Sequence, residues 1–162
     1  EEEKKNEKEL FSAFQSEYAG PSHYYYVNKF QGKYQFRYGY TDNGAYVDNK
    51  IDNPALKIVE QDEDYYNNFM KELLPIIKDW NDSYMNTSIP NGTEWQIYSE
   101  GVSIHGLNDF PENFDNAISI IKRYFDVNNN YINKYDIDPH DNIPEDLYGI
   151  PDFLKYQDDE DQ

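Results

Sequence analysis

The sequence contains no cysteine, which excludes disulfides, thiolate metal ligands and cysteine nucleophiles together. No apolar run reaches the roughly 18 residues of a membrane-spanning helix. Glycine-rich phosphate loops and the G-x-S-x-G elbow of serine hydrolases are absent as well. Basic residues are scarce, because 14 Lys and Arg stand against 32 Asp and Glu, a formal net charge of −18. Such a charge repels nucleic acids and anionic membranes, and it favours basic partners, divalent cations or simply solubility.

Aromatic residues are abundant: the 162 residues include 17 Tyr, 9 Phe and 2 Trp. A high net charge can keep a chain disordered, but aromatic side chains bury large areas and indicate a folded core. The length suits one domain. We predict a single α+β domain over residues 1–156, with residues 1–8 as a charged tether in one alternative, and a disordered acidic tail at 157–162.

In the first half of the chain, period-two and period-3.6 patterns predict one helix and three or four strands. Gln31-Gly32 separates two aromatic-rich segments, residues 22–30 and 33–40, which we interpret as a hairpin. Asn43-Gly44 is a second turn that leads to a predicted third strand at 45–51. Residues 55–61 are either a fourth strand or the approach to a helix. A first helix over residues 3–18 is predicted from four apolar residues at helical spacing, Leu10, Phe11, Phe14 and Tyr18.

In the second half, acidic residues 62–64 precede an apolar helical stripe that extends to Trp80, and Pro75 predicts a kink or break near Leu74. Strands at 93–99 and 102–106 and an amphipathic helix at 111–125 follow. The predicted fold is an antiparallel sheet, a meander plus a hairpin, covered on one face by about three helices. An irregular acidic segment begins at Asp126.

The stretch EWQIYSEGVSIHGLNDFPENFD, residues 94–115, joins the second hairpin to the last helix. Trp95 and Ile97 are predicted to face the core, while Gly106 and Asn108 suit tight turn conformations. None of its residues is a credible nucleophile. We interpret the stretch as scaffold.

The aromatic hairpin predicts phenols on the surface. Neighbouring residues of a strand point to opposite faces, so Tyr24, Tyr25 and Tyr26 cannot all face one core. We therefore expect exposed phenols on at least one sheet face, drawn from these three residues and from Tyr34, Tyr38 and Tyr40. Exposed aromatic residues beside acids are typical of sugar sites and of protein–protein contacts.

Catalytic and metal-binding patterns are weak. The histidines, His23, His105 and His140, have no partner at the spacing of a helical metal pair. Carboxylates are so numerous that two near each other say little about acid–base catalysis. We predict no enzyme activity and no cofactor.

The acidic C-terminal segment matches no EF-hand loop. In the frame that starts at Asp126, Tyr131 occupies the position that requires glycine. An irregular calcium site of Asp136, Asp138 and Asp141 stays open as an alternative, although we predict a solvated loop and no metal site.

Residues 95–114 carry a pattern, Trp95-x-Ile97 followed by Gly106-x-Asn108-x-x-Pro111-x-x-Phe114, which follows LLPIIKDWNDSY at 73–84. Over roughly residues 70–125 the chain resembles small uncharacterised proteins and lipoproteins of low-GC Gram-positive bacteria. The resemblance implies a hairpin joined to a closing helix and a bacterial source, and it implies no activity. In composition the chain is also similar to immunity proteins of bacterial polymorphic toxins.

These features lead to one functional hypothesis and two alternatives. We predict a non-catalytic acidic protein, an immunity protein or inhibitor that neutralises a toxin or other basic protein by occluding its surface. The alternatives are a surface-tethered lipoprotein that binds a small ligand, calcium or glycan, and a nucleic-acid-mimic inhibitor. Because the chain opens with Glu1, a lipid tether on a precursor is one alternative, and we favour a membrane-tethered extracytoplasmic location over the cytoplasm. The expected partner contacts are Tyr135, Asp136, Asp138, Asp141, Glu145, Asp146 and Tyr148.

Overall fold

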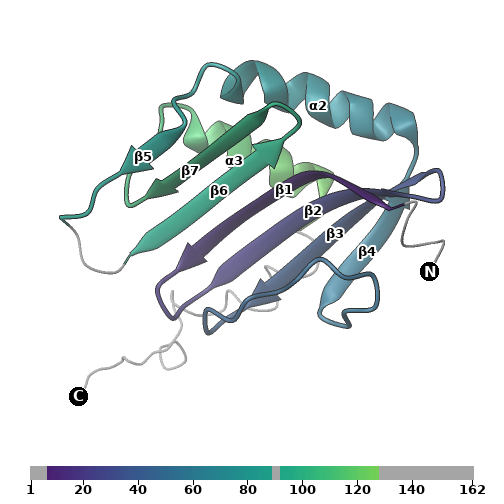
Figure 1. Ribbon diagram of the computed structural model, residues 1–162, viewed down its shortest axis with the longest axis horizontal. Coiled ribbons are helices and arrows are strands. Elements are labelled where there is room, and N and C mark those ends of the chain that lie inside the picture. Colours follow the sequence, from purple (N-terminus) through teal and green to yellow (C-terminus); the bar gives the residue numbers. More distant parts are fainter. Residues whose placement is uncertain (1–6, 89–91, 128–162) are drawn as a thin grey trace. The chain divides into compact units, whose positions relative to one another are not determined.

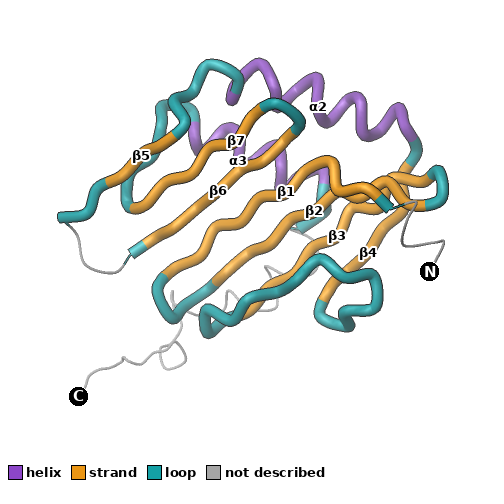
Figure 2. Tube along the Cα trace, in the orientation of Figure 1, coloured by secondary structure: helices purple, strands orange, loops and turns teal. Residues whose placement is uncertain are grey.

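The computed structural model describes residues 7–88 and 92–127, and all structural statements below concern these residues. By its contacts the chain divides into residues 1–125 and 126–162, and the fold described here is that of the first unit. Its elements are shown in Figures 1 and 2. They are β1 (Lys8–Glu17), β2 (Ser22–Phe30), β3 (Lys33–Thr41), β4 (Leu56–Gln61), α2 (Glu63–Ile77), β5 (Ser83–Met85), β6 (Thr93–Ser99), β7 (Val102–Leu107) and α3 (Phe114–Tyr124).

The strands form one seven-stranded sheet in the order β4-β3-β2-β1-β6-β7-β5 (Figure 1). All neighbours are antiparallel except β5 and β7, which pair in parallel from Ser83 opposite His105 to Met85 opposite Leu107. The α+β prediction is confirmed, but the sheet is mixed instead of purely antiparallel. The three-residue β5 was not predicted. It forms because the chain returns after α2 to the free edge of β7, and so short a strand leaves little periodicity in the sequence.

The predicted first helix is wrong, because residues 8–17 form β1, which lies between β2 and β6. The register against β2 shifts between Glu9 and Phe11, so Leu10 is an extra residue in the strand. Both Leu10 and Phe11 are buried as a result. Two adjacent buried residues in a bulged strand, followed by Phe14, imitate the spacing of a helical stripe.

The predicted third strand is also wrong, whereas the hairpin of β2 and β3 is confirmed. Of the two alternatives for residues 55–61, the structure shows the strand, β4. Residues 42–55, here called the covering loop, cross one face of the sheet without pairing (Figure 2). Val47 of this loop is buried, and the Tyr26 hydroxyl donates to the Val47 carbonyl oxygen at 2.6 Å. Gly39 makes room for it, since a Cβ there would lie 2.5 Å from Val47 Cγ1.

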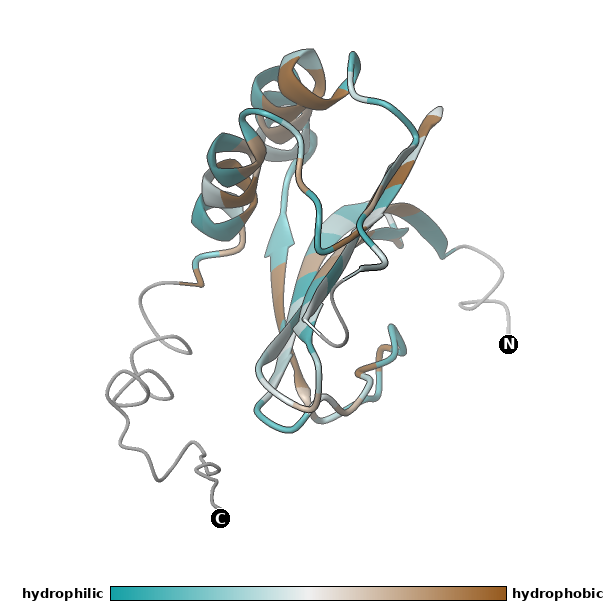
Figure 3. Ribbon diagram, turned by 90° about the vertical axis from the view of Figure 1, so that its left-hand side faces the viewer, coloured by the Kyte–Doolittle hydropathy of each residue, from teal (hydrophilic) through white to brown (hydrophobic). Residues whose placement is uncertain are grey.

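Within the described residues two helices, instead of about three, cover the other face of the sheet (Figure 3). The Asp62 side chain caps α2 by accepting from the Tyr65 backbone N–H at 2.9 Å. Pro75 lies in the last turn, and α2 ends two residues later. The core between the layers is largely aromatic and aliphatic, with Phe11, Val27, Phe36, Trp95 and Ile97 from the strands and Phe69, Leu73, Ile77, Ala117 and Ile121 from the helices.

The covering loop overturns the expectation of exposed phenols on β2 and β3. Tyr25 points to the helices, whereas Tyr24 and Tyr26 point to the opposite face, as alternation requires. All three are nonetheless buried, because the covering loop shields the second face. Among the described tyrosines, the most exposed are Tyr18, Tyr46 and Tyr98.

Candidate functional site

The stretch at residues 94–115 has the packing role that the sequence predicts. Trp95 is fully buried, and its Nε1 donates to the Asp109 carbonyl oxygen at 2.9 Å. Gly106 lies on the opposing strand, where a Cβ would be 2.2 Å from Trp95 Nε1. The indole therefore fits only against glycine, and its hydrogen bond fixes the link between β7 and α3.

That link changes direction through left-handed residues. Asn108 has a φ of 56°, and its Oδ1 accepts from the Thr93 backbone N–H at 2.8 Å. Asn113 precedes α3 with a φ of 72° and makes no side-chain cap bond. Asparagine tolerates this conformation better than other side chains do. Phe110 is consequently held in the link, outside both the strand and the helix.

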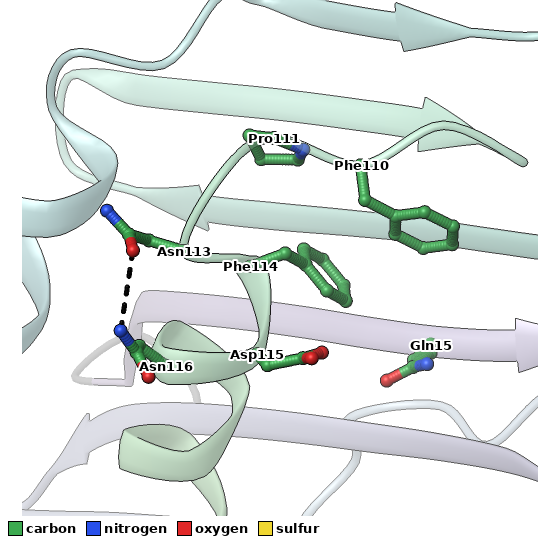
Figure 4. Close-up of a pocket in the computed structure, with 7 residues that line it drawn as sticks. All are labelled: Gln15, Phe110, Pro111, Asn113, Phe114, Asp115 and Asn116. Carbon is green, nitrogen blue, oxygen red and sulfur yellow. Dashed lines mark hydrogen bonds between the residues drawn. The ribbon is translucent and has the colours of Figure 1, made fainter.

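The same link lines an open hollow of about 510 Å³ at the start of α3 (Figure 4). In this view Asn113 and Asn116 lie at one end, where the Asn116 amide donates to Asn113 Oδ1 at 3.4 Å. Asp115 of α3 lies below the Phe114 ring in this view, and Gln15 of β1 lies on the side of Phe110. This cavity is here called the α3 hollow. It is lined by Gln15, Phe110, Pro111, Asn113, Phe114, Asp115 and Asn116.

Phe110 gives the α3 hollow an aromatic wall. Its ring stacks near Trp95 at an interplanar angle of 16° and meets Phe114 with ring centroids 4.9 Å apart. Phe114 is buried, but 41% of Phe110 is exposed. A rigid, partly exposed aromatic ring in a concave setting is typical of a binding site.

The chain segment that lines the α3 hollow is acidic. Asp115 lines the hollow, Asp109 and Glu112 flank its lining residues Phe110 and Pro111 in the sequence, and no Lys or Arg occurs from residue 94 to residue 121. A helix N-terminus contributes only about half a positive charge. Three carboxylates outweigh it, so the field favours a cation over an anion.

Sequence reasoning missed the α3 hollow because it assigned packing roles to all of residues 94–115. One signal was available: Phe110 is an apolar residue that belongs to no strand or helix pattern, and acids flank it. Such a residue has no periodicity to explain it, and a binding role is a reasonable hypothesis for it.

The sequence-predicted contacts, Tyr135 to Tyr148, lie outside the described residues, as does the alternative calcium site at Asp136, Asp138 and Asp141. Among residues 7–88 and 92–127, no three Cys, His, Asp or Glu side chains gather closely enough to hold a metal ion. His23 contacts Tyr38, its Nδ1 being 2.6 Å from the phenolic oxygen, and His105 is exposed on β7.

No helix in the described part of the chain is long and apolar enough to cross a membrane. Compared with protein-family models, curated proteins and solved structures, the chain shows no significant match. The resemblance to Gram-positive lipoproteins and to immunity proteins therefore stays a prediction, and the functional argument depends on the geometry and charge of the chain itself.

Proposed function

We propose that this chain is a non-catalytic acidic binding protein, an immunity protein or inhibitor that neutralises a toxin or other basic protein by occluding its surface. The observation that carries the proposal is the α3 hollow, where an exposed aromatic ring lies in an acidic segment whose carboxylates form no ion pair with the described residues. Aromatic residues commonly anchor protein interfaces. Acidic surroundings steer a basic partner toward its contact.

The acidic C-terminal segment supports the same function. Residues 126–162 carry 11 of the acids and 2 of the lysines, which is half of the net charge of −18 in less than a quarter of the chain. We propose that Tyr135, Asp136, Asp138, Asp141, Glu145, Asp146 and Tyr148 contact the partner as well.

A second candidate function is a surface-tethered protein that binds a small neutral ligand such as a glycan. The observation in its favour is the three carboxamides of the α3 hollow, Gln15, Asn113 and Asn116, beside the exposed Phe110 ring. Carboxamides donate to and accept from sugar hydroxyls, and aromatic rings pack against the faces of sugars.

The test is neutralisation of a basic protein encoded beside this chain. Co-expression should relieve its toxicity, and the purified proteins should associate at a rate that falls with salt. D109N/E112Q/D115N should slow association more than the control D42N/D52N/D64N, because both lose three exposed charges but only the first set lies in the segment that lines the α3 hollow. A third variant, D136N/D138N/D141N, tests the C-terminal contacts.

Two results would count against the proposal. If all three variants slowed association equally, the net charge alone would control the rate and the α3 hollow would have no specific role. If no basic protein encoded beside this chain forms a complex with it or loses its toxicity on co-expression, the inhibitor function is wrong.

A further inference from the structure

We propose that the α3 hollow binds an arginine side chain, and specifically its guanidinium group, from the basic partner. This inference rests on the proposed function and identifies the chemical group that the site recognises. Three features of the hollow carry it: a flat aromatic wall, hydrogen-bond acceptors on two different elements, and acidic residues that no Lys or Arg accompanies between residues 94 and 121.

The aromatic wall suits a planar cation. Phe110 is held in place by Trp95 and Phe114, with ring centroids at 6.4 Å and 4.9 Å, yet 41% of it remains exposed. A guanidinium group stacks on such a ring through cation–π attraction and flat contact. An aliphatic side chain in place of Phe110 would offer a guanidinium group neither interaction.

The acceptors come from two different elements. Figure 4 shows the Asp115 carboxylate on the first turn of α3 and the Gln15 carboxamide on β1, both near the aromatic rings. A carboxylate accepts two parallel N–H bonds from a guanidinium group, which leaves further N–H donors for the Gln15 carbonyl oxygen. The five donors of arginine therefore match the acceptors of both residues.

Charge and shape separate arginine from other ligands. Asp109, Glu112 and Asp115 disfavour a phosphate or carboxylate ligand, even though α3 begins at the hollow. A lysine ammonium carries the same charge, but it is compact and strongly hydrated and cannot stack as a plane. We therefore expect the hollow to bind arginine more tightly than lysine, and to bind either cation more tightly than a neutral sugar.

The experiment is an NMR titration of the ¹⁵N-labelled full chain with four probes: N-acetylarginine amide, N-acetyllysine amide, N-acetylglucosamine and inorganic phosphate. The arginine probe should shift the side-chain amide of Gln15 and the backbone amides of Phe110, Asp115 and Asn116. Its affinity should exceed that of the lysine probe by about threefold or more, the scale of an exposed cation–π contact.

Matched variants separate the site from general charge. D115N and F110L should each weaken arginine binding by about threefold or more. D64N removes an acid from the start of α2, and Y98L removes an aromatic residue of similar exposure, 37%, from β6, so both should leave binding unchanged. Dispersed spectra of all four variants show that the fold is retained.

The outcomes distinguish this inference from the proposed function. Shifts with the sugar but not with the arginine probe would overturn the inference and favour the neutral-ligand function. Equal affinity for arginine and lysine, or effects of D64N equal to those of D115N, would also overturn it. If arginine binds as described while no basic partner exists, the guanidinium site stands and the inhibitor function falls.

Discussion

Arg37 on β3 is a positive side chain with no exposed surface, and its surroundings explain how it is tolerated. Its Nη1 donates to Glu7 Oε2 and to Asn49 Oδ1, both at 2.9 Å, and its Nε and Nη2 donate to Gln35 Oε1. Asn28 completes the group by donating to Glu7 and accepting from Asn49. The network joins β2 and β3 to the covering loop and to the chain just before β1, so one cation holds several segments together.

We predict that R37M lowers the free energy of unfolding by about 3 kcal/mol, because it leaves Glu7 and Gln35 without their main donor beneath the covering loop. Urea denaturation measures the change. The control is R123M, which breaks the ion pair of Arg123 with Glu72 on the exposed faces of α2 and α3. That loss should be much smaller, since exposed ion pairs contribute little. Equal losses for the two variants would contradict a structural role for the buried network.

At the scale of elements, β2 and β3 are joined by side chains as well as by their ladder. His23 on β2 and Tyr38 on β3 are hydrogen-bonded at 2.6 Å beside the rings of Tyr25 and Tyr40. Burial, assisted by the positive charge of Lys122 on α3, lowers the pKa of His23 to about 4. The folded protein therefore holds His23 neutral where the unfolded chain would protonate it.

This difference predicts a pH dependence of stability. Between pH 6.5 and about 4 the unfolded chain binds a proton at His23 that the folded protein does not, so the contribution of His23 to the free energy of unfolding falls as the pH falls. The total loss is at most about 3 kcal/mol. H23Q should flatten the dependence between pH 6.5 and 4.5, whereas H105Q, the same change on the exposed face of β7, should preserve it. Denaturation series at several pH values measure both, and an unchanged slope for H23Q would refute the assignment.

A second contact between elements, that of Glu72 on α2 with α3, affects stability only below this pH window. Hydrogen bonds from Arg123 and Tyr124 on α3 lower the pKa of Glu72 on α2 to about 2. A carboxyl group with a lowered pKa loses its contribution only as the pH falls below its ordinary value of about 4.5. Above pH 4.5, the effect of His23 on the pH dependence of the free energy of unfolding can therefore be measured without a contribution from Glu72.

At the scale of the whole molecule, the net charge of −18 controls long-range encounters. We predict that a fluorescent DNA duplex of about 20 base pairs shows no change in anisotropy with this protein at about 50 mM salt, where phosphate contacts would be strongest. An octa-arginine peptide should bind under the same conditions and dissociate as the salt concentration rises. Binding of the DNA, or salt-independent binding of the peptide, would contradict an acidic exterior that selects basic partners.

Local patterns in the sequence were enough to predict much of the fold. They did not predict the shape of the α3 hollow. Turn residues such as Gln31-Gly32 and Gly101, the alternation of Trp95 and Ile97, and the stripes of α2 and α3 depend on neighbours close in sequence, so those elements were predictable. Net charge and the lack of cysteine are likewise properties of composition and need no structure.

Only the tertiary structure decided the features that join distant residues. The position of β1 between β2 and β6, the parallel addition of β5 and the docking of the covering loop on Gly39 all depend on packing across the sheet. For the same reason the α3 hollow could not be read from the chain: Gln15 and Phe110 are separated by almost a hundred residues and meet only because β1 lies beneath the start of α3.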